Sequence, residues 1–439
     1  MSAQRFHLAW FLHGSSATSW GRPYSGNIGR EWMRPDFVVD MARAMERACF
    51  DYLLIEDSSY VADAYGDSMD LYLRHGSATP RQDPSVVAAI LSQHTSRLGI
   101  VPTVGTFGVQ PYLLARMIGT LDQLSQGRIG WNVVTGSSDR AAQNYGMDGM
   151  PEHDSRYEMA DEFMTVANAL FTSWEPDAIV NDLERGVFAD PKRVHHIDHV
   201  GERFSVRGPL NSGPLPQGRP VIAQAGGSGR GRQFGAQHAD TILSLVSGVE
   251  NMKAFRDDVR SKAVAAGRNP DDVKVLFIVS PVLGLTDAEA QARLEQRRQE
   301  ALDKAELTLA QQSKITNIDF SQYDLDAPLD PAGLTTNGHQ QELDRFLAVV
   351  AECSTLREAA TKFYGGTSVN LVGTPDAVAA QMGEVMAEVG GDGFLFSTGD
   401  LHRRAIAEIT DGLVPALQER GLVRTEYTHA QFRDNLLEF

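Results

Sequence analysis

Short apolar segments alternate along the chain with longer segments whose apolar residues recur every three or four positions. The short segments predict strands, and the longer ones predict amphipathic helices. Several short segments are apolar throughout, which is typical of parallel strands covered on both faces. The eight expected strands are His7–His13, Tyr52–Ile55, Leu98–Val104, Arg128–Thr135, Pro220–Gln224, Thr241–Val246, Val273–Val279 and Gly393–Phe396.

Helical patterns follow these strands in turn. They cover Asp36–Cys49, Pro84–Thr95, Tyr112–Leu124, Ser155–Phe171, Gly231–His238, Val249–Ala266, Pro375–Val389 and His402–Arg420. Eight strand–helix units predict an α/β fold, the closed (β/α)₈ TIM barrel. A doubly wound open sheet is the structural alternative, because periodicity alone does not prove closure.

Two segments interrupt the alternation, and we expect both to be insertions within one domain that spans residues 1–439. The first, about 173–218, follows the fourth helix and is rich in Pro, Gly and charge. The second, about 286–368, lies between the seventh strand and its helix, and contains helical patterns at Asp287–Ala310 and Gln340–Cys353. Long insertions in a barrel often carry function. The tail Thr425–Phe439 is expected to be a packing arm.

Charge and cysteine content narrow the functional classes. The net charge of −17 disfavours binding to nucleic acid and to anionic membranes, and is most simply a source of solubility. The two cysteines, Cys49 and Cys353, do not suggest a disulfide framework. The first apolar run is too short for a signal peptide, and no run approaches the roughly 20 apolar residues that span a bilayer. We therefore expect a cytoplasmic location.

A glycine-rich segment, Ala225–Arg232 (AGGSGRGR), follows the fifth strand and begins a helix. Backbone N–H groups at a helix N-terminus form a favourable phosphate site. Gly226, Gly227 and Gly229 would allow close approach, Ser228 adds a hydroxyl, and Arg230 or Arg232 adds charge. The segment is not a dinucleotide-binding fingerprint, and a loop without a ligand is the simpler alternative.

Three other groups of residues are candidates for binding or catalysis. His153 and Tyr157 lie four residues apart at an expected helix start and share one face, although capping and packing explain them equally well. The run His195–His199 (HHIDH) fits a solvated strand edge better than a metal site. Glu56 and Asp57, at the end of the second strand, are possible acid–base groups or partners for a ligand hydroxyl or an arginine.

Longer motifs add a family resemblance. GRIGWNVVTGSSDRAAQNYG (Gly127–Gly146) and EHDSRYEMADEF (Glu152–Phe163) resemble the bacterial-luciferase-like flavin monooxygenases. The similar branch includes the large components of nitrilotriacetate, EDTA, dibenzothiophene-sulfone and long-chain-alkane monooxygenases. Pro220–Asp240 resembles the phosphate-end segment of that family. The resemblance covers nearly the whole chain, and YGDSMD and VFADPKRVHHIDH look most similar to the sulfone enzyme.

The resemblance implies a barrel that binds reduced FMN (FMNH₂), supplied by a separate NAD(P)H-dependent flavin reductase, and that reacts with O₂. Thr103 and Asn132 match residues that face the flavin ring, and are the expected catalytic pair. The other residues expected to bind the cofactor are Asp57, Thr135, His153, Tyr157, Ala225, Gly226, Gly227 and Ser228. Trp20 and Tyr60 are expected to line the substrate pocket. No metal is expected, and family members are homodimers or homotetramers.

The expected function is oxygenation of a small organic substrate, with cleavage of a C–S or C–N bond. Hydroxylation of long-chain alkanes, deazaflavin-dependent hydride transfer and a non-catalytic flavin-binding protein are the alternatives. The chain departs from the sulfone branch at Gly136, at Ile315, where a histidine is expected, and in the loop Gly14–Pro23, which lacks a histidine before Trp20. The loop Gly14–Pro23 and the loop that contains Ile315 are expected to line the substrate pocket. The substrate is therefore expected to differ from those of the relatives.

Overall fold

The computed structural model describes residues 5–13, 20, 26–364, 366–399 and 401–439. Eight parallel strands form a closed barrel in the order β1-β14-β11-β10-β9-β4-β3-β2. The predicted (β/α)₈ TIM barrel is therefore confirmed, and the open sheet is excluded. The strands are β1 His7–Leu12, β2 Tyr52–Ile55, β3 Gly99–Gly105, β4 Gly130–Val134, β9 Val221–Gln224, β10 Thr241–Ser244, β11 Lys274–Val279 and β14 Gly393–Phe396.

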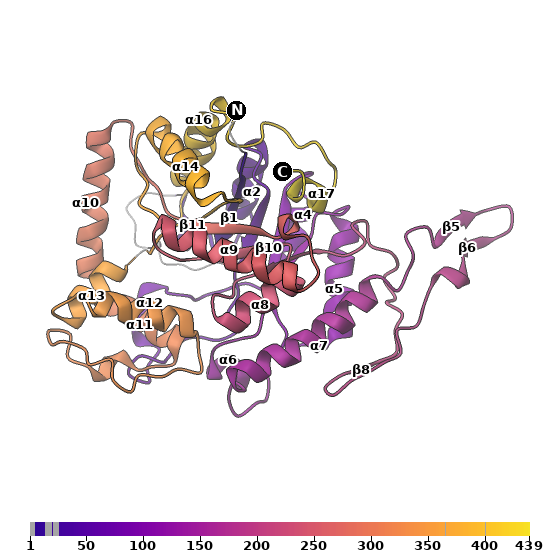
Figure 1. Ribbon diagram of the computed structural model, residues 1–439, viewed down its shortest axis with the longest axis horizontal. Coiled ribbons are helices and arrows are strands. Elements are labelled where there is room, and N and C mark those ends of the chain that lie inside the picture. Colours follow the sequence, from indigo (N-terminus) through magenta and orange to yellow (C-terminus); the bar gives the residue numbers. More distant parts are fainter. Residues whose placement is uncertain (1–4, 14–19, 21–25, 365, 400) are drawn as a thin grey trace.

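Helices surround the barrel, as the periodicity predicts (Figure 1). They are α2 Asp36–Arg47, α4 Pro84–Ser92, α5 Pro111–Leu124, α7 His153–Phe171, α8 Gly229–His238, α9 Val249–Ala265, α14 Pro375–Val389, α15 Arg403–Ala407 and α16 Val414–Glu419. Helix α15 joins α16 through a π-helical segment, Glu408–Leu413, where one continuous helix was expected. Pro415 lacks an N–H, so it cannot donate to the carbonyl four residues earlier, and a wider turn is favoured there.

Side chains alternate between the two faces of the barrel wall. Outward-facing residues pack under the helices, whereas Ala9, Leu54, Val101 and other inward-facing residues form a separate inner core. Phe432 and Leu436, from helix α17 Phe432–Leu436, complete this inner core. The tail is thus the packing arm that the sequence predicts, and its position leaves the opposite end of the barrel, where the strands terminate, for the site.

The first insertion forms two antiparallel hairpins that project from the barrel beyond α7 (Figure 1). Their strands are β5 Ile179–Asp182, β6 Val187–Ala189, β7 His199–Val200 and β8 Ser205–Val206. Only His199 of the HHIDH run lies in a strand, which corrects the expected strand edge over the whole run. Its histidines have separate partners: His195 contacts Glu175, and His199 contacts Glu162. In the part of the chain that the structure describes, no group of acidic, His or Cys side chains is arranged to hold a metal.

The second insertion builds a helical layer beside the barrel (Figure 1). Its helices are α10 Asp287–Asp303, α11 Ala305–Thr316, α12 Gln340–Val350 and α13 Leu356–Phe363. The single helix expected at Asp287–Ala310 is wrong, because the chain breaks at Lys304 and continues as α11. Helices α11, α12 and α13 share an apolar cluster that includes Leu309, Phe320 and Phe346. This cluster fixes α11 as a rigid element.

Remaining short elements complete the chain. They are α1 Ile28–Glu31, α3 Asp70–His75, α6 Asp139–Asn144, β12 Val282–Leu283 and β13 Val372–Gly373. Strands β12 and β13 pair in parallel at the two ends of the second insertion. Within the described ranges, no helix is long and apolar enough to cross a membrane. Cys49 and Cys353 are both free thiols.

Candidate active site

Thr103 and Asn132 face each other across the adjacent strands β3 and β4. The Asn132 Nδ2 donates to Thr103 Oγ1 at 2.8 Å, and both residues are buried. The other amide atom, Asn132 Oδ1, is buried and has no hydrogen-bond partner among the described residues. An unpaired buried carbonyl costs free energy unless a ligand supplies a donor. The pair therefore presents an acceptor for a bound ligand.

The glycine-rich segment lies where β9 meets α8. Ser228 caps α8, and its hydroxyl accepts from the Gly231 backbone N–H at 2.9 Å. Burial raises the pKa of the Tyr157 hydroxyl, and the side chains of Ser228 and Thr135 are close enough to lower it in part. His153 Nε2 lies 3.4 Å from Ser228 Oγ. Residues from β4, α7 and the β9–α8 turn thus converge on one helix N-terminus.

Close packing explains the glycines here. A Cβ at Gly231 would lie 2.7 Å from the Tyr157 hydroxyl and 3.0 Å from Ser228 Oγ. A Cβ at Gly226 would collide with Gln224, and one at Gly227 with Gln341 of α12. Glycine is therefore required at these positions for the backbone and the surrounding side chains to pack closely around the helix N-terminus. The arrangement suits an anionic group such as a phosphate.

The two arginines of this segment are each paired with a carboxylate. Arg230 pairs with Asp161, and its guanidinium lies 5.3 Å from the centre of the Tyr157 ring. Arg232 pairs with Asp258 and donates to the Gly227 carbonyl. Arg230 Nη1 is nevertheless buried without a hydrogen-bond partner among the described residues, so a charge contribution to a phosphate stays a prediction.

Acidic residues at the end of β2 occupy two environments. Glu56 Oε2 lies 3.0 Å from His13 Nδ1, and Glu56 Oε1 lies 3.1 Å from Arg81 Nη1. Burial alone would raise the pKa of Glu56, but Arg81 and His13 outweigh it and hold that pKa far below its usual range. Burial raises the pKa of Asp57 to about 6, with Asp83 adding to the effect. Glu56 is therefore a fixed carboxylate, whereas Asp57 titrates closer to neutrality.

The second insertion covers the strand ends. Tyr60 donates to the Lys314 carbonyl of α11 at 3.3 Å, and Asn317 donates to the Ser137 carbonyl at 2.9 Å. Arg156 contacts the Asn337 backbone carbonyl at 3.1 Å. These contacts join the insertion to the loops after β2 and β4 and to the start of α7. Tyr60 thus lies against the insertion, as expected for a pocket wall.

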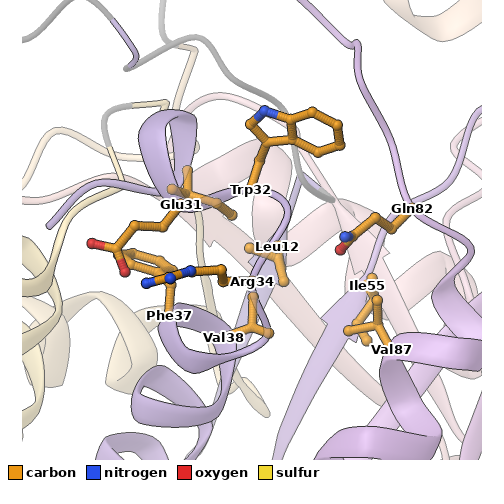
Figure 2. Close-up of a pocket in the computed structure, with 10 residues that line it drawn as sticks. Leu12, Glu31, Trp32, Arg34, Phe37, Val38, Ile55, Gln82 and Val87 are labelled. Atoms are coloured by element: carbon orange, nitrogen blue, oxygen red, sulfur yellow. The ribbon is translucent and has the colours of Figure 1, made fainter.

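Trp20 is half exposed, and its carbonyl accepts from Arg30 Nε at 3.1 Å. The rest of the expected pocket loop, 14–19 and 21–23, lies outside the described residues. Figure 2 shows a small hollow nearby, lined by Leu12, Ile55, Trp32 and Phe37. Leu12 and Ile55 belong to the outward-facing core, so this hollow lies outside the barrel wall and is separate from the site.

Comparison with known proteins adds to this geometry. A family model described as luciferase-like monooxygenase matches residues 10–393. The chain belongs to the luciferase-like monooxygenase family. It is 38% identical to dibenzothiophene-sulfone monooxygenase of Rhodococcus erythropolis (strain XP), across 99% of this chain and 97% of that protein. It is 35% identical to dimethyl-sulfide monooxygenase of Hyphomicrobium sulfonivorans, across 98% and 89% of the two chains.

Among solved structures, it is similar to a riboflavin lyase bound to modified FMN and riboflavin. The TM-score is 0.87 and the identity 34%, over 99% of this chain and 96% of that one. The resemblance stated from the motifs is thereby confirmed, as is the enzyme class: this chain is a luciferase-like, flavin-dependent monooxygenase. His13, Arg81 and Lys314 were missed from the sequence, because each reaches the strand ends from a separate segment without a recognisable motif.

Proposed function

We propose that this chain is the oxygenase component of a two-component monooxygenase, which uses reduced FMN and O₂ to oxygenate a small organic substrate with cleavage of a C–S or C–N bond. Two relatives named for organosulfur substrates favour the C–S case. The observation that carries the cofactor assignment is the convergence of Ser228, Tyr157 and His153 on the α8 N-terminus, where the glycines let the backbone pack closely.

The described residues fit FMN at both of its ends. The phosphate would bind at the Gly226–Ser228 turn, with His153, Tyr157 and Thr135 beside it and Ala225 at its edge. The ring would lie against Thr103 and Asn132, where Asn132 Oδ1, which has no partner among the described residues, would accept a hydrogen bond. Asp57 lies at the end of the neighbouring strand, and its raised pKa allows it to hold a proton near neutral pH.

Reduced FMN supplies the electrons that activate O₂. The protein's residues hold the ring in one orientation, position the substrate beside it and exclude water. Thr103 and Asn132 orient the ring edge, Tyr60 and Trp20 would contact the substrate, and the second insertion covers the strand ends. The fixed hydrogen bond between Asn132 and Thr103 keeps both side chains in place without ligand.

The electrons require a partner protein. The glycine-rich turn lacks the dinucleotide fingerprint and follows the fifth barrel strand rather than the first. A separate NAD(P)H-dependent flavin reductase would therefore supply reduced FMN. The projecting hairpins expose apolar side chains, including Leu183 and Phe188, which suits a homodimer or homotetramer. Free thiols and acidic charge suit the cytoplasm.

A stopped-flow experiment tests this function. Protein loaded anaerobically with reduced FMN is mixed with O₂, and the flavin absorbance is followed with and without sulfides, sulfones, sulfonates, aminopolycarboxylates or alkanes. We expect reoxidation kinetics that differ from those of free FMN, and faster product formation with an organosulfur compound. Reoxidation identical to that of free FMN, together with tight binding of reduced deazaflavin, would favour hydride transfer instead.

Replacing Asn132 with alanine is expected to slow oxygenation by about 5- to 30-fold, the equivalent of one buried hydrogen bond of about 1–2 kcal/mol. The residues proposed to bind the FMN phosphate are unchanged in this variant, so FMN affinity should fall less than the oxygenation rate. The measurement is kcat with a reductase in excess. The control is Asn251→Ala on α9, where an exposed amide bonds only a local carbonyl. Equal rates for the two variants would contradict the assignment.

A further inference from the structure

Lys314 is a buried cation whose ammonium has no hydrogen-bond or ion-pair partner among the residues that the structure describes. It lies in the last turn of α11, and its ammonium is 6.0 Å from the centre of the Tyr60 ring. The residue is only 8% exposed, yet its ammonium makes no hydrogen bond or ion pair among the described residues. Burial lowers the pKa of Lys314 to about 8, so most molecules still carry the charge at pH 7. Buried charges ordinarily find a partner.

Arg81 is a second cation with unused donors beside it. Its side chain is 6% exposed and lies 3.1 Å from Glu56 through Nη1. Neither Nη1 nor Nε makes a well-oriented hydrogen bond among the described residues. Glu56 is also engaged with His13, whose other nitrogen is 2.8 Å from Ser397 Oγ. Glu56 is the carboxylate fixed in this cluster. It leaves hydrogen-bond donors free on both Arg81 and Lys314.

These donors lie next to the expected position of the flavin ring. Strand β2 pairs with β3 so that Ile55 is opposite Pro102, and the next residues, Glu56 and Thr103, are neighbours at the strand ends. Lys314 reaches the same place from the second insertion, close enough for Glu56, Arg81 and Asp57 to affect its charge. Two cations thus border the space in which a substrate would meet the ring.

We propose that Arg81 and Lys314 bind an acid group of the substrate, a carboxylate or a sulfonate, so that this enzyme acts on anionic compounds. A guanidinium and an ammonium complement an oxyanion, and charge-assisted hydrogen bonds are the stronger kind. The inference rests on the proposed function and specifies its substrate class. It also gives a physical reason for a substrate different from the neutral sulfone and sulfide for which the two relatives are named.

Calorimetric titration of the protein loaded with oxidised FMN tests the inference without turnover. The probes are (phenylthio)acetate, 2-(phenylthio)ethanesulfonate and the neutral 2-(phenylthio)ethanol, and the two anions distinguish carboxylate from sulfonate. At least one anion should bind about tenfold more tightly than the alcohol. Lys314→Met and Arg81→Gln should each weaken binding of the anion by about tenfold. Neither variant should change the affinity for the alcohol. Arg81→Lys should retain part of the affinity for the anion that Arg81→Gln loses.

The matched control is Lys253→Met, which removes an exposed charge on α9 and should change neither affinity. Equal binding of all three probes by the wild-type protein overturns the inference. So does a Lys314→Met variant that weakens FMN binding but not anion binding, because Lys314 would then serve the cofactor. Both results leave the proposed function intact if reduced FMN still binds and consumes O₂. Failure of FMN binding or O₂ consumption overturns the function and, with it, the inference.

Discussion

Arg424→Met is expected to lower the free energy of unfolding by about 3–5 kcal/mol, as for other buried ion pairs that lose one partner. Arg424 and Asp51 are almost fully buried, 2.9 Å apart, and Asp51 also contacts His7 at 2.9 Å. Arg424 further donates to the Asn435 carbonyl at 2.6 Å, which ties the C-terminal arm to the barrel. Among the described residues, the variant would leave the buried Asp51 carboxylate with His7 as its remaining side-chain hydrogen-bond partner. Denaturant unfolding at neutral pH measures the change.

The matched control is Arg420→Met, because the Arg420–Asp376 pair is largely exposed and should contribute about 0–1 kcal/mol. Burial alone would raise the pKa of Asp51, but Arg424 and His7 lower it. A lowered carboxyl pKa stabilises the fold above about pH 4 and loses that effect as the pH falls toward the folded-state pKa. The gap between wild type and Arg424→Met should therefore narrow in acid. An equal loss in the free energy of unfolding for Arg424→Met and Arg420→Met would contradict this account.

Gly231→Val is expected to weaken FMN binding by about 100-fold or more, equivalent to roughly 3 kcal/mol. A Cβ there already meets the Tyr157 hydroxyl and Ser228 Oγ, and the two further methyl groups of valine would displace both from the helix N-terminus. The loss follows because these groups, with the backbone N–H donors, form the proposed phosphate site. Fluorescence titration with FMN measures the affinity, and circular dichroism confirms that the variant is folded.

Gly229→Ala provides the control two residues earlier. A Cβ at Gly229 would meet no heavy atom within 4 Å, so FMN affinity should stay within about twofold of wild type. Alanine is also the better helix former, so stability should not decrease. An unchanged affinity in a folded Gly231→Val protein would mean that the phosphate binds elsewhere.

The barrel was predictable because its signals are local. Continuous apolar strands and amphipathic helices repeat eight times, and all eight strands lie at or within two residues of their expected positions. The break at Lys304 was not predictable, since neither glycine nor proline marks it and the apolar cluster of the second insertion decides where α11 begins. Helix α7 begins at His153 rather than Ser155 because Glu152, not a typical cap, accepts the first N–H groups.

The residues of the candidate site also fall into two groups: those that a local sequence motif marks and those that only folding brings together. Gly226, Ser228, His153 and Tyr157 belong to motifs that can be recognised within a few residues, and the structure brings them together. Lys314 and Arg81 become neighbours only after the insertion folds over the strand ends, more than two hundred residues apart in sequence. No local pattern marks such a pair. Glu56 was noted from its place at the strand end, but its partners His13 and Arg81 were not.

The position of Phe432 and Leu436 has a consequence for synthesis of the chain. These residues complete the inner core at the base of the barrel, yet among the described residues they are translated nearly last. All eight strands leave the ribosome before the segment that covers their apolar base. The barrel therefore cannot complete its interior until this arm has emerged from the ribosome. A nascent chain halted before Phe432 would expose that base, and would be a natural target for chaperones or proteases.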